Sequence, residues 1–271
     1  MLKRFHLWWR KVRAIFSIYF QDSLAYRGQA IVWILTDVVP AMVMPLVWLS
    51  AYNGKSAIGG YSPGEMVLYY LCMVTFTNFV VAHLMWDVAT EIKEGRFSVY
   101  LVRPFSYCQT LMISNLAWRV FRLMVFVPML ALGVWIYAPH ITHLRYEWGI
   151  TFWLALVLGH VVSFMLSYAL GLLALFFQEV FSVYNIYYIP MLFLSGQLVP
   201  IGVFPDWLQA VSRYMPFQYT VALPTEVFMG RVPDSLAWQG IGMQVLWTVL
   251  LYGLSRVFWR KGLLYYTGVG M

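Results

Sequence analysis

The chain has 271 residues, of which 62% are hydrophobic and only 11% are charged, with a formal net charge of +7. Soluble domains are about 45–50% apolar and about 25% charged, so this composition excludes an ordinary soluble protein and indicates a polytopic membrane protein. A span needs about 20 residues to cross roughly 30 Å, so this length accommodates about six spans and leaves little room for a soluble catalytic domain.

Residues 1–27 predict an amphipathic helix at the cytoplasmic membrane interface. Apolar residues such as Phe5 and Trp8 recur at helical spacing, and basic residues such as Arg4 and Lys11 lie largely opposite them. The basic face suits an anionic leaflet, where each Lys or Arg contributes roughly 1 kcal/mol. The alternative is an ordinary basic flank with no further role.

Six apolar segments then predict an all-α integral membrane domain at residues 28–260, followed by a cytoplasmic tail at 261–271. The second segment begins with Ser62, Pro63 and Glu65 in a capping-box arrangement. The predicted spans are about 28–50, 62–86, 120–138, 149–177, 180–199 and 235–257. The stretch at 104–118 either lies on the membrane or starts the third span.

Prolines interrupt the chain between the fifth and sixth spans. Because Pro200 and Pro205 break any continuous helix, the chain from Pro205 to Met215 can form only about 11 helical residues, roughly 16 Å, which is too short to cross a bilayer. We therefore predict a short or re-entrant outer segment at about 200–225. Broken backbone at membrane depth requires protein or water partners, which suggests a cavity lining, with a passive outer cap as the alternative. The candidate lining residues of a substrate path are Ser195, Gly196 and Pro200.

The placement of basic residues orients the chain. With both termini in the cytoplasm, about 14 of the 18 Lys and Arg residues lie inside, as the positive-inside rule requires. The exceptions are Lys55, Arg145, Arg213 and Arg231. Because orientation explains the positive charge, we do not expect a nucleic-acid partner.

Two sequence fragments suggest a nucleotide site, but neither is complete. "LSGQ" at 194–197 is like part of the ABC ATPase signature, and "NGKS" at 53–56 is like the end of a phosphate-binding loop. Leu49 stands where that loop needs its first glycine, so its backbone N–H groups cannot surround phosphates. No nucleophile-and-base arrangement has supporting context either. We expect no catalytic residues and no cofactor bound by this chain.

Asp37 is the one carboxylate well inside a predicted span. An ionised group there costs roughly 2.5–3.5 kcal/mol on insertion scales, so it should face the bundle, water or a partner. It is a candidate substrate-path residue. The alternative is a structural hydrogen bond to another helix.

The fourth span carries a small residue at every fourth position: Ala155, Gly159, Ser163, Ser167 and Gly171. Such a stripe lets helix backbones approach closely in lipid. It predicts a packing seam, either within the protomer or at a dimer interface.

Two groups of potential metal ligands were weighed, and no metal site is predicted. His83, Asp87 and Glu91 recur at intervals of four residues, but a span that leads into a charged segment gives the same spacing. The second group, His140, His143 and Glu147, falls in an outer loop.

Two longer segments resemble ABC-2-type transporter permeases. "FLSGQLVPIGVFPDWLQAVSRYMPFQY" is similar to the fifth span and re-entrant segment of that family, and "EIKEGRFSVYLVRPFSY" at 91–107 is similar to its cytoplasmic loop. The resemblance implies a coupling helix at about 87–98 that contacts a separate ATPase. The implied coupling residues are Asp87, Glu91, Lys93, Glu94, Arg96, Phe97, Arg103 and Pro104.

The resemblance also implies partners and location. A cytosolic ABC ATPase, in two copies, would hold ATP and Mg, and a second permease, identical or homologous, would complete the pathway. The complex would lie in the bacterial plasma membrane, in contact with its lipids, and export an amphipathic or lipid-like substrate such as a drug, lipid or glycoconjugate. The alternatives are an integral membrane enzyme acting on lipids and a non-transporting membrane scaffold.

Overall fold

The computed structural model describes residues 2–141, 144, 146–177 and 179–267, except for the side chains of residues 2–5, 29, 30, 37, 40 and 41. Over these residues the fold is helical, as the sequence predicts, with a single isolated β-bridge between Ile58 and Tyr61. The helices are α1 (Leu2–Ala25), α2 (Arg27–Tyr52), α3 (Pro63–Val80), α4 (Met85–Lys93), α5 (Ser98–Leu101), α6 (Tyr107–Ile141), α7 (Ile150–Gly171), η1 (Leu172–Leu175), α8 (Val180–Leu194), η2 (Ile201–Val203), α9 (Asp206–Ser212), α10 (Ala222–Phe228) and α11 (Asp234–Gly262).

Four helical segments in the described part of the chain are long and apolar enough to cross a membrane. They are Pro63–Lys93, Tyr107–Ile141, Ile150–Leu175 and Asp234–Gly262. Two shorter apolar stretches, Met42–Tyr52 and Val180–Leu194, accompany them. The predicted spans correspond to these four segments, to α2, which has 26 residues and whose described apolar part is Met42–Tyr52, and to the shorter α8.

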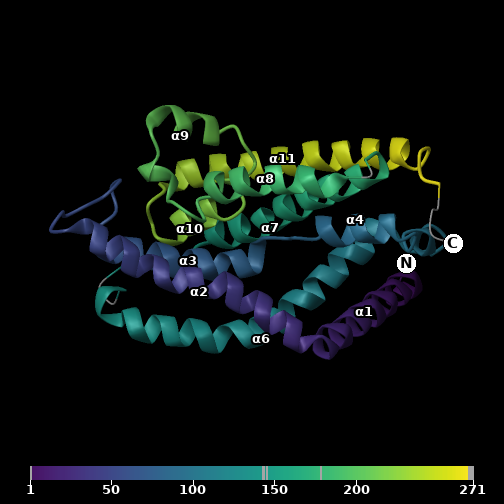
Figure 1. The fold of residues 1–271 in the computed structure, drawn as a ribbon, viewed down its shortest axis with the longest axis horizontal. Coiled ribbons are helices and arrows are strands. Elements are labelled where there is room, and N and C mark those ends of the chain that lie inside the picture. The colour runs from purple at the N-terminus through teal and green to yellow at the C-terminus, as the bar shows by residue number, and fades with distance from the viewer. Residues whose placement is uncertain (1, 142–143, 145, 178, 268–271) are drawn as a thin grey trace.

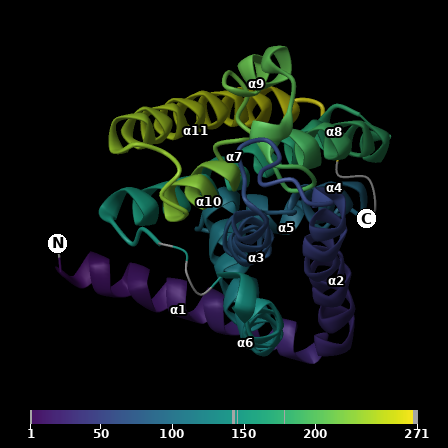
Figure 2. The ribbon, with the colours of Figure 1, turned by 90° about the vertical axis from the view of Figure 1, so that its left-hand side faces the viewer.

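The helices form an elongated bundle whose two ends differ (Figure 1). The start of α1, the helix α4 and the end of α11 lie towards one end, and the loop after α2 and the short helix α9 lie towards the other. Figure 2 shows α1 crossing beneath α6 before the chain turns into α2, and α1 packs mainly on α6.

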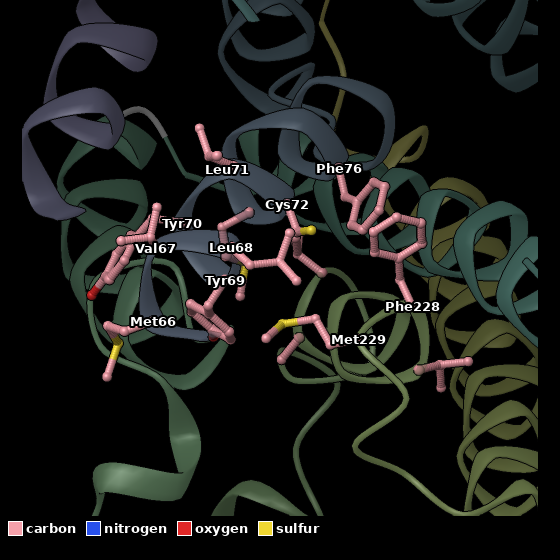
Figure 3. Packing of buried hydrophobic residues seen from close by; sticks show 14 of the residues in the cluster. Met66, Val67, Leu68, Tyr69, Tyr70, Leu71, Cys72, Phe76, Phe228 and Met229 are labelled. Carbon is pink, nitrogen blue, oxygen red and sulfur yellow. The ribbon is translucent and has the colours of Figure 1, made fainter. Parts of the chain in front are cut away.

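The helix α3 is the centre of the half of the core towards α9 and the loop after α2, which we call the outer half after the orientation that the sequence predicts. The predicted capping box is confirmed: the Ser62 hydroxyl accepts a bond from the Glu65 N–H, while the Glu65 carboxylate accepts one from the Ser62 N–H. Of the 18 residues of α3, 12 are buried, because α2, α6, α7 and α10 all pack against it. Figure 3 shows this cluster, in which Phe76 meets Phe228 of α10.

The second predicted span is not one continuous helix. It ends at Val80, a non-helical link follows at residues 81–83, in which Val81 is extended, and α4 begins at Met85. The residues of this link, Val-Ala-His, include neither proline nor glycine, so the helical pattern of the sequence gave no sign of the break. Contacts from other helices must therefore hold the link open.

The ambiguous stretch at 104–118 is mostly helix and belongs to the third span. The helix α6 starts at Tyr107 and continues through Pro128 to Ile141. Its polar residues, such as Arg119, turn inward and find partners inside the bundle. The sequence at 104–118 is polar, which suggested a segment on the membrane surface, but polar side chains such as Thr110 are buried in the bundle.

The outer segment between the fifth and sixth spans consists of short pieces. Pro205 caps the seven-residue helix α9, and the chain then folds back to a second short helix, α10, which the sequence did not predict. Trp207 and Tyr214 are largely exposed on the outside of this segment. Its inner residues pack on α3 and α7.

Candidate functional site

The segment that resembles a coupling helix folds as a helix, a tight turn and a short helix. The helix α4 ends at Lys93, and Gly95 has φ +76°, a left-handed conformation that a residue with a side chain rarely adopts. The chain therefore reverses at Gly95 and enters α5. The predicted helix at 87–98 thus has a turn in its second half.

The predicted coupling residues divide into an exposed group and a buried group. The exposed side chains are Asp87, Lys93, Glu94, Arg96, Arg103 and Pro104. Arg96 and Glu94 form an ion pair of 2.6 Å, and Lys93 approaches Glu179 at 3.9 Å. Exposed pairs of this kind contribute little to stability, so these charges are available to contact another protein.

Glu91 faces the protein and connects three helices. Its carboxylate accepts hydrogen bonds from Tyr100 at 3.0 Å and from Tyr107 at 2.6 Å, and the Tyr100 hydroxyl also lies 3.2 Å from that of Tyr19 in α1. Burial raises the pKa of Tyr100, and the bonds to Tyr19 and Glu91 raise it further, so the hydroxyl stays protonated. Glu91 is therefore an internal hydrogen-bond acceptor that joins α4 to α5 and α6, and Tyr100 extends this network to α1.

Phe97 is fully buried directly behind the turn. Its ring packs edge-on against Tyr107, Trp259 and Tyr266, with ring centroids 5.0–5.5 Å apart. Tyr266 also bonds to Ser98 at 2.8 Å. The turn thus rests on the end of α11, beside an open cavity of about 610 Å³ whose lining includes Arg103, Pro104 and Trp259.

The candidate substrate-path residues lie against α3. Ser195, Gly196 and Pro200 are buried, and the Gly196 carbonyl accepts a hydrogen bond from Tyr69 at 2.8 Å. Gly196 has φ +78°, and a Cβ atom there would lie 2.5 Å from the Tyr69 hydroxyl. The "SG" step therefore provides a close approach to α3. The side chain of Asp37 lies outside the described part of the structure.

The small-residue stripe of α7 packs within the protomer. A Cβ atom at Gly159 would lie 2.4 Å from the Thr220 carbonyl oxygen, and one at Gly171 would lie 2.8 Å from Val88 Cβ. Ser163 accepts a bond from the Ala82 N–H at 2.9 Å, and Ser167 accepts one from the Met85 N–H at 3.0 Å. The stripe thus contacts the outer segment and the link between α3 and α4.

The structure also contains a polar cluster at the outer end that the sequence did not reveal. Arg231 bonds to Glu65 at 2.9 Å and to Glu226 at 3.1 Å, and its guanidinium lies 3.8 Å from the Tyr61 ring centroid. Tyr61 donates a hydrogen bond to Glu226. Glu65 was recognised only as a helix cap, because its partner Arg231 is 166 residues away in the chain.

In this outer cluster, the attraction between opposite charges opposes the effect of burial, which disfavours the charged forms of Glu226 and Arg231. Burial raises the pKa of the Glu226 carboxyl, against the opposing effects of Tyr61 and Arg231. Burial also lowers the pKa of Arg231, but Glu226, Tyr61 and Glu65 raise it by more. The Arg231 guanidinium therefore stays charged and is the cation that both carboxylates share.

Metal ligands do not gather in the described residues. No group of three His, Cys, Asp or Glu side chains among them is arranged to hold an ion. In the first group from the sequence, His83, Asp87 and Glu91, the Glu91 carboxylate bonds to tyrosines. In the second group, His140, His143 and Glu147, His143 lies outside the described residues.

Comparison with known proteins identifies the family. The family model described as "ABC-2 family transporter protein" matches residues 38–270, which is most of the chain. No individual curated protein matches the sequence. Proteins of this family are the membrane components of transporters that work with an ABC ATPase, and they are not themselves catalytic. This chain, with its apolar helices, therefore belongs to the ABC-2 transporter family as a multi-pass membrane permease.

Proposed function

We propose that this chain is the permease subunit of an ATP-driven exporter in the bacterial plasma membrane. It works with two copies of a cytosolic ABC ATPase and with a second permease, identical or homologous. The observation that carries the proposal is the set of exposed, mixed charges at the turn after α4, backed by rigid internal contacts. Lys93, Glu94 and Arg96 offer these charges to a partner, and Asp87 lies exposed in the first turn of α4.

The packing behind the turn supports a role in transmitting force. An exposed loop held only by solvated charges would yield when pushed. Here Glu91 bonds to two tyrosines, and Phe97 packs on the end of α11. A push on the turn is therefore passed to α6 and α11 rather than absorbed locally.

In this proposal the substrate is amphipathic or lipid-like. The chain is 19% aromatic and has 15 methionines, which suits contact with flexible apolar molecules. The path includes Asp37 and the segment that contains Ser195, Gly196 and Pro200. Because that segment is now bonded to Tyr69 and Tyr70 of α3, those bonds must open before a substrate can pass.

Co-purification with charge reversal tests the proposed ATPase contact. The chain, expressed with the cognate ATPase, should retain it on an affinity column, and the variant Lys93→Glu/Arg96→Glu should retain at least tenfold less. Glu91 is unsuitable for this test, since it is an internal acceptor and its reversal would disturb the fold.

The control variant is Asp206→Lys/Arg213→Glu, which reverses two exposed charges of the outer segment. It should retain the ATPase fully. Equal retention by both variants would place the ATPase contact elsewhere, and a wild-type chain that captures no ATPase would contradict the proposed function itself.

A further inference from the structure

The link between α3 and α4 leaves backbone groups without partners in their own helix. A continuous helix would pair the Ala82 N–H with the Asn78 carbonyl and the Met85 N–H with the Val81 carbonyl. The Leu84 N–H would likewise pair with the Val80 carbonyl. Because residues 81–83 are not helical, these pairs are separated.

Arg119 takes the freed carbonyls. Its guanidinium, on α6, bonds to the carbonyl oxygens of Asn78 at 2.9 Å, Val80 at 3.1 Å and Val81 at 2.8 Å. His160 of α7 lies 3.0 Å from the same Val80 oxygen. The positive charge therefore lies against the negative end of α3, where a helix C-terminus favours a cation.

Two serines take the freed N–H groups. Ser163 accepts from Ala82, and Ser167 accepts from Met85. The acceptors of all three separated pairs thus bond to Arg119, and two of the three donors bond to serines of α7. Closing the helix would exchange three bonds to Arg119 and two bonds to the serines for three bonds within the helix, and would leave Arg119 and the serines to find other partners.

Local sequence does not impose the break. Residues 81–84, Val-Ala-His-Leu, have no proline or glycine, and Ala and Leu are good helix formers. A buried arginine that bonds mainly to backbone carbonyls is expensive to maintain, and a straight helix would not need it. The break is therefore a tertiary arrangement that competes with a continuous helix.

The packing is also divided at this point. The apolar cluster around α3 ends at Val81, and a second cluster, around α4 and the start of α6, begins at Ala82. The link therefore lies at the boundary between the two clusters, which α6 and α7 also join.

We propose that residues 63–93 form a two-state helix, broken at 81–84 in this structure and continuous in a second state, with Arg119, Ser163 and Ser167 stabilising the broken state. Extended residues rise about 3.3 Å and helical ones 1.5 Å, so closing three residues draws α4 about 5 Å towards α3. Its role in transport rests on the proposed function, because α4 carries the turn offered to the ATPase.

The test measures the distance between spin labels at Phe79 and Glu94, two exposed positions on either side of the link. The full chain, with Cys72 and Cys108 replaced by alanine, is studied in lipid nanodiscs without an ATPase. The distribution of label-to-label distances should shift towards roughly 22 Å, the rise of 15 residues in one helix, in Ser163→Ala/Ser167→Ala and in Arg119→Gln. Each single serine variant should give a partial shift.

Substitutions at position 84 distinguish closure of the helix from a general loosening of the packing around the link. Leu84 has φ −69°, which matches proline, and a proline there lacks the N–H that closure would pair with Val80. Leu84→Pro in the double-serine background should restore the wild-type distribution, whereas Leu84→Ala, which loses the same side chain but keeps the N–H, should not.

Ser255→Ala is the matched control, since Ser255 is a buried serine that bonds only within its own helix, to Leu251. It should leave the distribution unchanged. If the folded serine variants behave like this control, or if Leu84→Pro and Leu84→Ala act alike, the break is rigid and the proposal is wrong. These distances do not depend on ATPase capture, so this outcome is distinct from failure of the proposed function.

Discussion

Arg231 is the residue on which the outer end of the bundle depends most. It pairs with Glu65 at the start of α3 and with Glu226 in α10, and it covers the ring of Tyr61. About a fifth to a third of each charged side chain is exposed, so these pairs are neither surface contacts nor fully buried ones. They join the loop after α2 to the segment before α11.

Replacing Arg231 with methionine should destabilise the protein by about 2 kcal/mol, since it removes bonds to two partly buried carboxylates and leaves Glu226 without its cation. The measurement is the temperature at which half of the monodisperse protein is lost on heating. Arg231→Lys, which keeps the charge without the two-armed geometry, should lose less.

Glu226→Gln tests whether the stability lost in Arg231→Met comes from the unpaired charge of Glu226. In Arg231→Met/Glu226→Gln the two effects should be less than additive, because the second change removes the carboxylate that the first left unpaired. Strict additivity would mean that Arg231 stabilises the outer end through Glu65 and Tyr61 and not through Glu226.

At the scale of elements, the stripe on α7 holds the bundle together. It brings α7 so close to the outer segment and to α4 that a Cβ atom added at Gly159 would meet the Thr220 backbone, and one added at Gly171 would meet the Val88 side chain. The same helix provides both serines at the α3–α4 link. A single small-residue face thus serves as a packing surface and as a set of hydrogen-bond acceptors.

Gly159→Ala should lower stability by about 1–3 kcal/mol, because its Cβ atom would lie 2.4 Å from the Thr220 carbonyl oxygen and the backbone there must move. The control is Gly253→Ala in α11, where a Cβ atom meets nothing within 4 Å. That variant should be neutral or more stable by about 0.5 kcal/mol. Equal melting of the two variants would show that α7 can move away from Thr220 freely.

The sequence predicted the helices better than it predicted the breaks and contacts between them. Apolar content located the helices of the bundle, and turn chemistry located the α3 cap and α9, since these depend on residues close in the chain. The α3–α4 break depends instead on Arg119 and Ser163, about 40 and 80 residues away. Glu91 was likewise counted among the coupling residues, because the sequence cannot show that two tyrosines bond to it.

For the whole molecule, the decisive question is how many of its helices cross the bilayer. The four long segments can each cross by length and composition. The helix α8 has 15 residues and rises only about 22 Å, against roughly 30 Å of hydrocarbon. It can cross only if the following residues, which are buried against α3, complete the distance.

Labelling of single cysteines with a membrane-impermeant thiol reagent distinguishes six crossings from four. The exposed positions are Arg10, Lys55, Glu179 and Arg213, each replaced in turn by cysteine in a background without Cys72 and Cys108. If α2 and α8 both cross, Lys55→Cys and Arg213→Cys react in intact cells, and Arg10→Cys and Glu179→Cys react only after permeabilisation. If only the four long segments cross, each of these helices has both ends on one side, so Arg10 reacts like Lys55 and Glu179 like Arg213. The short α8 would then be a re-entrant element, and the substrate path would have to be formed by α3, α6, α7 and α11 alone.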